Sequence, residues 1–176
     1  MKKRILILIL LFISSSFLWI KNVNDTISNQ RSLLLYDNYQ TYETKTSPYY
    51  GILKIPKIEL EQGYFAKENN QNTVEKNIEQ ISLNCHPEEN CTILLAAHSG
   101  NSNISYFKNL DKLTIGDQAY ILKDQKLYTY QLKAIDYQQK SGYIVLPKNT
   151  YQLVLTTCSK KNSQLQEVYL FQKINL

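Results

Sequence analysis

Short apolar runs separated by turn residues fill residues 49–176, and this pattern restricts that part of the chain to an all-β fold. The runs that predict strands lie at Gly51–Ile55, Ile58–Glu61, Thr92–Ala97, Gln118–Lys123, Lys126–Ile135, Tyr151–Thr157 and Glu167–Gln172. Pro56 limits the first two runs to a sheet edge or to a break between strands. The sequence between Lys123 and Lys126 predicts a hairpin turn. We therefore expect a β-barrel or a β-sandwich.

Two segments between these strands predict short helical pieces. Asn72–Ile78 has the pattern of a capped helix, with Asn72 or Thr73 as the N-cap. Ser105–Leu110 predicts one further turn. The predicted fold class is all-β with short helices.

The N-terminus predicts one membrane-spanning helix. Basic residues 2–4 precede Ile5–Ile20, a 16-residue run without charge. Such a run is about 24 Å long as a helix, slightly short of a hydrocarbon core of about 30 Å, and Trp19 suits the outer interface. The predicted organisation is a transmembrane anchor at 1–21, an extracellular tether at 22–48 and a catalytic domain at 49–176. The basic flank favours a cytoplasmic N-terminus.

A cleaved signal peptide has the same basic and apolar parts. The anchor is favoured because no small-x-small cleavage site follows Trp19. The cleaved form stays open as the alternative.

The charge of the domain argues against a nucleic-acid partner. Residues 49–176 contain 14 Lys and no Arg against 8 Glu and 4 Asp, a net charge of +2. The lysines are scattered and do not gather in one segment, so we expect no nucleic-acid binding.

The three cysteines do not form the framework of a disulfide-rich domain. Cys85 and Cys91 bracket a short polar turn, so either a local disulfide or a free pair fits the sequence. Cys158 is left over in both cases. An unpaired thiol in an exported protein points to a chemical role.

Cys158 and His98 each follow an apolar run that predicts a strand. A thiol nucleophile needs an imidazole that exchanges protons with it. The chain has one other histidine, His86, whose place in a Pro-Glu-Glu turn predicts a solvated surface residue. We therefore predict that Cys158 and His98 form a catalytic pair.

Three segments resemble the sortases, the membrane-anchored cysteine transpeptidases of Gram-positive bacteria. Leu155-Thr156-Thr157-Cys158 matches the end of the TLxTC signature, with Val154 in place of the first Thr. Leu95-Ala96-Ala97-His98, followed by Phe107, Leu110, Leu113 and Gly116-Asp117, is similar to the family's histidine segment, with Ala97 for the usual Gly. Gly51–Ile58 looks like the first strand of the family.

The resemblance implies an eight-stranded sortase β-barrel and a transpeptidation reaction. Cys158 is the nucleophile that attacks an LPXTG-like C-terminal sorting signal, and His98 is the general acid and base. The acyl-thioester passes to an amine of a lipid-linked cell-wall precursor or of a pilin lysine. The implied partners are surface proteins or pilins that carry such a signal, at the outer face of the cell membrane.

The substrate-binding residues that the resemblance implies are Ala97, Thr156 and Thr157. We expect no cofactor and no metal, because two histidines and scattered carboxylates give no ligand spacing. Weak Ca²⁺ binding is the one exception, and it requires that the fold gathers the carboxylates of Glu59, Glu61, Glu88 and Asp111. Substrate selection is assigned to residues 136–149.

One departure from the family concerns the arginine that sortases usually carry on the strand after the cysteine. Residues 49–176 contain no arginine. Strand alignment predicts that Gln166, or else Gln164, takes its place as an oxyanion donor. Lys160 and Lys161 are the alternative cations. Removal of one such donor costs roughly a hundredfold or more in rate in other enzymes.

Two other functions therefore stay open. One is a thiol hydrolase or peptidase on the same barrel, with water as the acceptor. The other is a non-catalytic relative that binds a sorting signal without turnover.

Overall fold

The computed structural model describes Ser16, Trp19 and residues 48–146 and 152–174, and the two long ranges form one compact unit. The strands are β1 (Gly51–Ile55), β2 (Leu60–Tyr64), β3 (Glu79–Gln80), β4 (Ile93–Ala96), β5 (Gln118–Lys123), β6 (Lys126–Gln139), β7 (Leu153–Cys158) and β8 (Leu165–Lys173). Two short 3-10 helices, η1 (Pro56–Ile58) and η2 (Leu110–Lys112), lie between them.

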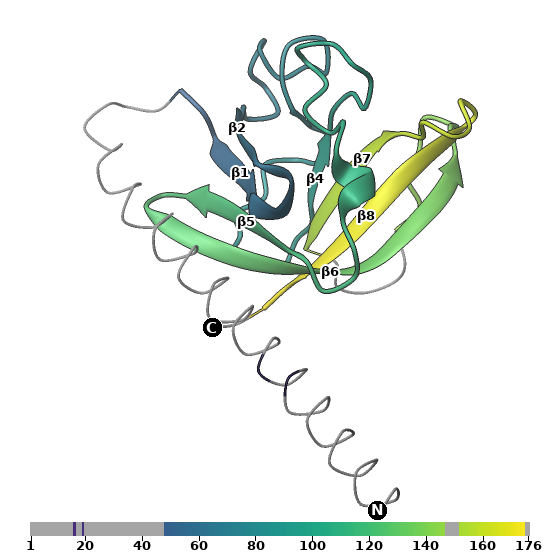
Figure 1. Cartoon of the computed structure of the whole chain (residues 1–176). Coiled ribbons are helices and arrows are strands. Elements are labelled where there is room, and N and C mark those ends of the chain that lie inside the picture. The colour runs from purple at the N-terminus through teal and green to yellow at the C-terminus, as the bar shows by residue number, and fades with distance from the viewer. Residues whose placement is uncertain (1–15, 17–18, 20–47, 147–151, 175–176) are drawn as a thin grey trace, which may run out of the picture. The chain divides into compact units, whose positions relative to one another are not determined.

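The strands form one sheet in the order β2-β1-β5-β6-β8-β7-β4-β3. The two edges of this sheet meet at a parallel bridge between Tyr64 and Ile78, which nearly closes the sheet into a barrel. Figure 1 shows the long strand β6 running under both halves of the sheet. The predicted eight-stranded β-barrel is confirmed.

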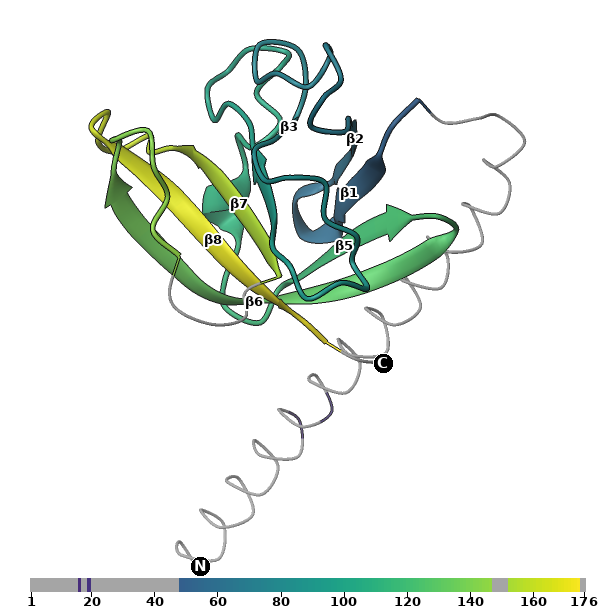
Figure 2. The same cartoon turned by 180° about the vertical axis from the view of Figure 1, so that it is seen from behind.

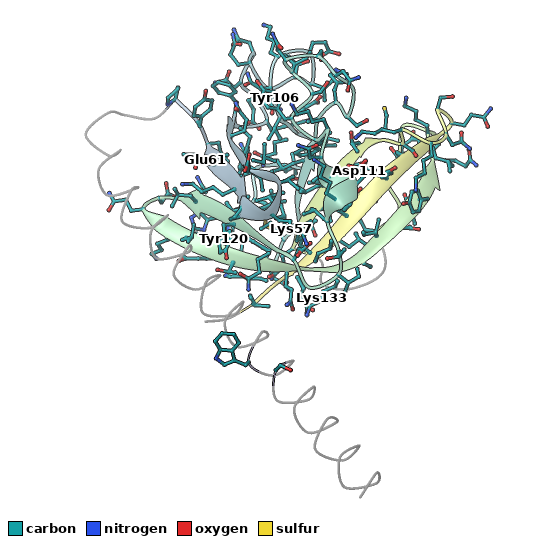
Figure 3. All side chains as sticks on the ribbon, viewed as in Figure 1. Lys57, Glu61, Tyr106, Asp111, Tyr120 and Lys133 are labelled. Atoms are coloured by element: carbon teal, nitrogen blue, oxygen red, sulfur yellow. A yellow bond between two sulfur atoms is a disulfide. The ribbon has the colours of Figure 1, made fainter. Side chains whose placement is uncertain are left out.

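Strand β6 changes faces at Lys133. Leu132 pairs with Phe171 of β8, and Ala134 pairs with the adjacent Leu170, so Lys133 is an extra residue in the ladder. An inserted residue inverts the alternation of the side chains that follow it. Leu132 and Phe171 thus face the main core, whereas Ala134 and Leu170 belong to a second cluster on the opposite face. Figure 3 labels Lys133 at this point of β6.

The second cluster is small and lies outside the barrel. Val154, Val168 and Leu170 of β7 and β8 are buried in it. Ile144 and Leu146, from the loop after β6, pack against these residues. This loop therefore covers part of the outer face of the sheet.

Two predicted strands, Gly51–Ile55 and Gln118–Lys123, match β1 and β5 residue for residue. The strand expected at Ile58–Glu61 lies at Leu60–Tyr64, because η1 occupies Pro56–Ile58 and Glu59 has a φ of 54°. Strand β3 was not predicted. Its two residues are too few to show an alternation.

The helix predicted at Asn72–Ile78 is wrong, since the chain forms turns there. The Asn72 side chain, expected to cap that helix, holds β3 in place. Its Oδ1 accepts from the Gln80 N–H at 2.7 Å, and its Nδ2 donates to the Gln80 carbonyl at 3.0 Å. The turn expected at Ser105–Leu110 is present.

The predicted hairpin turn joins β5 and β6. Lys123 pairs with Lys126, and the two residues between them, Asp124 and Gln125, have φ values of 48° and 65°. Both values lie in the left-handed region that tight two-residue hairpin turns require.

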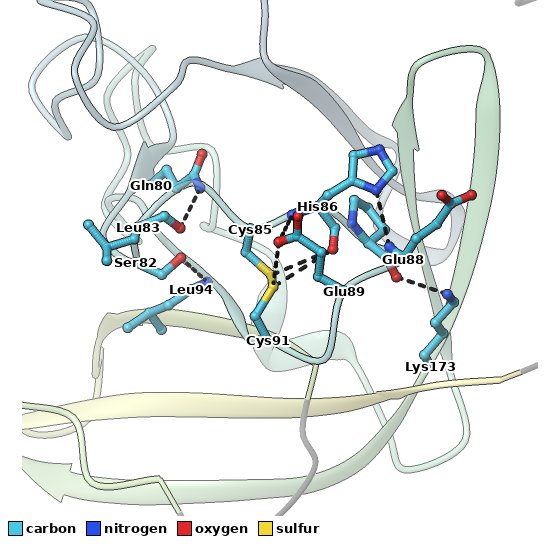
Figure 4. The surroundings of a disulfide bond; sticks show 11 residues. Gln80, Ser82, Leu83, Cys85, His86, Glu88, Glu89, Cys91, Leu94 and Lys173 are labelled. Atoms are coloured by element: carbon cyan, nitrogen blue, oxygen red, sulfur yellow. Dashed lines mark hydrogen bonds between the residues drawn. A yellow bond between two sulfur atoms is a disulfide. The ribbon is translucent and has the colours of Figure 1, made fainter.

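A disulfide joins Cys85 and Cys91, whose Cα atoms are 6.0 Å apart, so the bridged alternative is the one present (Figure 4). The loop that it closes docks on the β5–β6 hairpin. His86 Nε2 lies 3.1 Å from Asp124 Oδ2, and His86 Nδ1 accepts from the Glu88 N–H at 3.2 Å. His86 thus lies at the surface with 25% of its side chain exposed, and both ring nitrogens have protein partners that the sequence did not predict.

The predicted anchor at 1–21 and tether at 22–48 lie outside the described residues, except for Ser16, Trp19 and Pro48. Ser16 and Trp19 are helical. Within the part of the chain that the structure describes, no helix has the length and apolar character needed to cross a membrane.

Candidate active site

His98 and Cys158 lie at the carboxyl ends of neighbouring parallel strands. The register of β4 and β7 pairs Leu95 with Leu155 and Ala96 with Thr156. Two further residues along each chain bring His98 beside Cys158, on strands that are about 4.8 Å apart. The fold thus brings together two residues that are sixty positions apart in the sequence.

Two buried hydroxyl groups tie these chain ends together. Thr157 Oγ1 donates to the Ala97 carbonyl at 2.7 Å. Ser99 Oγ donates to the Cys158 carbonyl at 2.6 Å. One bond therefore precedes the predicted catalytic pair and the other follows it, and the backbones of His98 and Cys158 are fixed relative to each other.

Cys158 is the free thiol of the chain, since the other two cysteines are joined. Its side chain is half-buried, as is that of His98. A half-buried thiol is accessible to a substrate and still shielded from part of the solvent. This exposure suits a nucleophile better than a structural cysteine.

Gln166 lies directly opposite Cys158 in the antiparallel ladder of β7 and β8. Directly opposed side chains share one face of a sheet, so the strand position predicted for the arginine substitute faces the same side as the thiol. The amide of Gln166, however, already has partners. Its Nε2 donates to the Tyr143 carbonyl at 2.8 Å and lies 3.5 Å from the Gln139 carbonyl. The role of Gln166 as an oxyanion donor stays a prediction, as does the alternative at Gln164.

The two lysines after Cys158 differ in their surroundings. Lys160 Nζ lies 3.1 Å from Asp111 Oδ2 and also donates to the Lys108 carbonyl. Figure 3 labels Asp111 on η2, next to β7. Lys160 thus links the loop after Cys158 to the segment after His98, whereas Lys161 is exposed.

The three residues predicted to bind substrate are all buried. Ala97, Thr156 and Thr157 have 5%, 5% and 6% of their surface exposed. Thr156 Oγ1 donates to the Glu167 carbonyl at 3.2 Å, so both threonine hydroxyls bond to backbone. Their role in substrate binding stays a prediction.

A groove of about 660 Å³ lies between β6 and the loop that follows it. It is lined by Ala134, Ile135, Asp136, Gln138, Gln139, Ser141, Tyr143, Val145 and Leu170. This lining overlaps residues 136–149, the segment assigned to substrate selection. Asp136 is the one lining residue whose side chain carries a charge.

The loops after β2 and β4 gather at one end of the barrel, as both views show (Figures 1 and 2). Tyr106, labelled in Figure 3, joins them through a bond from its hydroxyl to the Lys76 carbonyl at 3.5 Å. Glu75 of the first loop lies within electrostatic range of His98. The Thr73 hydroxyl is the main cause that lowers the pKa of Glu75, and His98 adds to this effect.

The sequence did not single out Ser99 or Glu75, and it placed Gln138 in the substrate-selection segment 136–149 without a role of its own. Ser99 directly follows the predicted histidine, so its position alone could have drawn attention. Gln138 is joined to the groove wall by loop contacts that no sequence pattern encodes, and Glu75 is linked to His98 through electrostatics alone.

The carboxylates considered for Ca²⁺ are dispersed. Glu61 pairs with Lys54, Glu88 with Lys126, and Asp111 with Lys160. Across residues 48–146 and 152–174, no three His, Cys, Asp or Glu side chains cluster in a way that could hold a metal ion.

A family model described as the sortase domain matches residues 53–172. The chain therefore belongs to the sortase family of cysteine transpeptidases, and the resemblance in the sequence is confirmed. No match was found among the curated proteins.

Solved structures of sortases have the same fold. Sortase C of Streptococcus pneumoniae has a TM-score of 0.63 at 21% identity, over 75% of this chain and 72% of that chain. Sortase D5 of Clostridium perfringens, a transpeptidase, has a TM-score of 0.60 at 20% identity, over 79% and 88%. A lid mutant of sortase A from Corynebacterium diphtheriae has a TM-score of 0.62 at 18% identity, over 76% and 75%. At these identities the likeness concerns the fold alone.

Proposed function

We propose that this protein is a membrane-anchored cysteine transpeptidase that cleaves an LPXTG-like sorting signal and transfers the cleaved protein to an amine. The observation that carries the proposal is the parallel register of β4 and β7, which puts His98 beside the free thiol of Cys158. Membership of the sortase family supports the same reaction class.

In the first half-reaction the Cys158 thiolate attacks the carbonyl carbon of the scissile peptide bond. The resulting tetrahedral oxyanion collapses, the carbon–nitrogen bond breaks, and His98 gives its proton to the leaving amine. The products are a thioester on Cys158 and a free C-terminal fragment.

In the second half-reaction an amine of a cell-wall precursor or of a pilin lysine attacks the thioester carbonyl. His98, now neutral, accepts the proton of the attacking amine. The carbon–sulfur bond breaks and the Cys158 thiolate is restored. The same imidazole thus acts first as an acid and then as a base.

The proposed location is the outer face of the cell membrane, with residues 1–21 as a single-pass anchor. The sorting signal and a lipid-linked acceptor are both confined to the membrane surface. An enzyme tethered to that surface meets both substrates at a raised effective concentration.

Intact-mass spectrometry of the full chain in detergent tests the proposal. The protein is mixed with a pool of LPXTG-like peptides, with and without an amine acceptor, and Cys158→Ala is run beside it. We expect an acyl adduct on the wild type alone, which the amine discharges into a ligated product. Wild type without an adduct from any peptide would count against the proposal.

The same experiment separates the two alternative functions. A hydrolase yields the free acid whether or not the amine is present. A non-catalytic binder, which the engaged amide of Gln166 and the missing arginine favour, retains peptide without any adduct.

A further inference from the structure

Cys158, Gln166 and Gln138 form a row across three neighbouring strands. Cys158 of β7 pairs directly with Gln166 of β8, and Gln166 pairs directly with Gln138 of β6. Directly opposed residues in an antiparallel ladder point to the same face, so the thiol and both amides lie on one side of the sheet. The three backbones span two strand spacings, about 10 Å.

The side-chain amide of Gln138 holds the loop after β6 by two hydrogen bonds to the backbone of one residue. Its Nε2 donates to the Val145 carbonyl at 2.7 Å, and its Oε1 accepts from the Val145 N–H at 2.9 Å. The same Nε2 lies 2.9 Å from Asp136 Oδ2, which fixes the orientation of the amide. Gln138 thus satisfies the loop backbone at Val145 as a neighbouring strand would.

Gln166 holds the same loop two residues earlier, through its bond to the Tyr143 carbonyl. The loop turns back toward the sheet at Gly142, whose φ of 82° suits glycine. Ile144 lies between the two residues that these glutamines bind, and it packs on the outer apolar cluster. Three successive residues, 143–145, are therefore fixed to the row that contains the nucleophile.

The fixed segment is one wall of the groove. Tyr143 and Val145 line it on the loop side, and Gln138 and Asp136 line it on the β6 side. The exposed fractions of Tyr143 and Val145 are 78% and 73%, so their side chains contribute little burial to hold this wall in place. The hydrogen bonds from the two glutamine amides and the packing of Ile144 must set the width of the groove.

We infer that Gln138 and Gln166 act together as an amide clamp that holds residues 143–145 as the groove wall, and that Gln166 is therefore a positioning residue for substrate binding. This inference rests on the proposed function in taking the groove as the site of the sorting signal. It gives Gln166 a different role from that of an oxyanion donor, and the two roles predict different kinetics.

The test uses the full chain in detergent with three variants: Gln138→Ala, Gln166→Ala and Gln172→Ala. Gln172 is the matched control, an exposed glutamine on the same strand as Gln166. The first readout is hydrogen exchange at the Val145 amide. The second is the separation of KM from kcat for the peptide that gives the acyl adduct.

The clamp predicts that Gln138→Ala and Gln166→Ala each raise KM by about two- to tenfold, the range for one or two lost hydrogen bonds, with kcat nearly constant. Both variants also speed exchange at Val145, although Gln166 does not itself bond to that amide. Gln172→Ala changes neither readout.

Gln166→Glu guards against a general loss of structure, because it keeps the size of the side chain but replaces the donor amide with a charged carboxylate that can only accept. It should raise KM as Gln166→Ala does, with an unchanged unfolding temperature.

A fall in kcat with Gln166→Ala alone, with KM and Val145 exchange unchanged, would overturn the clamp in favour of an oxyanion donor. Unchanged exchange at Val145 in Gln166→Ala would also overturn it, whatever the kinetics. The exchange experiment needs no turnover, so an inactive protein would contradict the proposed function and leave the clamp to be decided by exchange.

Discussion

The two sides of the candidate site are held by different kinds of contact. On the side of β4 and β7, His98 and Cys158 are fixed by strand register and by the buried hydroxyls of Thr157 and Ser99. On the side of β6 and β8, residues 143–145 of a largely exposed loop are fixed by hydrogen bonds from the side-chain amides of Gln138 and Gln166.

This difference predicts that substitutions on the β4–β7 side are tolerated less well than substitutions in the loop. Loss of a buried hydrogen bond leaves a desolvated carbonyl without a partner, whereas water replaces a lost partner near the surface. Changes on the β4–β7 side should therefore affect both stability and chemistry. Changes on the loop side should mainly affect which substrate binds.

The largest expected effect comes from a comparison of the two histidines. His98→Ala should lower the rate of acyl-adduct formation roughly thousandfold, because it removes the general acid and base. His86→Ala should leave that rate unchanged, since His86 contacts the β5–β6 hairpin. Quenched reactions analysed by mass spectrometry measure both rates. An equal fall in rate for the two variants would contradict the assignment of His98 as the general acid and base.

The next effect concerns the disulfide, which belongs to neither side of the site. Replacement of Cys85 and Cys91 by Ser should lower the free energy of unfolding by about 2 kcal/mol, the low end for disulfides because the loop is short. Urea unfolding measures this change. Adduct formation at 25 °C should stay as in the wild type, and a large loss there would show that the loop controls β4.

A pair of threonine variants examines the buried bonds. Thr157→Val and Thr156→Val should each lose about 1–2 kcal/mol of unfolding free energy, because each removes a buried hydrogen bond from a side-chain hydroxyl to a backbone carbonyl. Only Thr157→Val should also lower kcat, since Thr157 bonds to Ala97, the residue before His98. Equal kcat values for the two variants would remove Thr157 from the positioning of the pair.

The smallest effect follows from the tyrosines. Burial raises the pKa of Tyr169 above its ordinary value, and the bond to Glu167 adds to this shift. Burial and then a bond to Glu88 raise the pKa of Tyr128 to about 12. Above a pH of about 10 the unfolded chain loses phenolic protons that the folded protein keeps, so the free energy of unfolding should fall.

Urea unfolding at pH 8 and at pH 11 measures this decline, and Tyr169→Phe should reduce it. The two glutamine side chains of the amide clamp do not titrate. Exchange at Val145, corrected for the intrinsic rate, should therefore follow the stability of the barrel between pH 8 and pH 11. A separate response of the loop would point to an ionisable neighbour, such as Asp136 beside the Gln138 amide.

The barrel, and the positions of Cys158 and His98 at the ends of neighbouring strands, could be predicted because each rests on local information. Apolar runs at Gly51–Ile55 and Gln118–Lys123 coincide with strands, and the motif residues around Cys158 and His98 are contiguous in sequence. Family membership then supplied the arrangement that brings the two motifs together.

What could not be predicted depends on contacts between distant segments. Asn72 has the character of a helix cap, yet it bonds to Gln80 and holds a two-residue strand. His86 lies in a polar turn, yet it docks on Asp124 across 38 residues. Gln138 carries no motif, and only the fold places it in the row of Cys158.

The extra residue at Lys133 divides β6 into two stretches with opposite orientation. Removal of this one residue would exchange inward and outward side chains along 134–139, so that Ile135, Tyr137 and Gln139 would take the orientation of Ala134, Asp136 and Gln138. The face that bears Asp136 and Gln138 is thus encoded separately from the core within a single strand. Substitutions at 134, 136 and 138 should alter the lining of the groove while the residues before Lys133 still face the core.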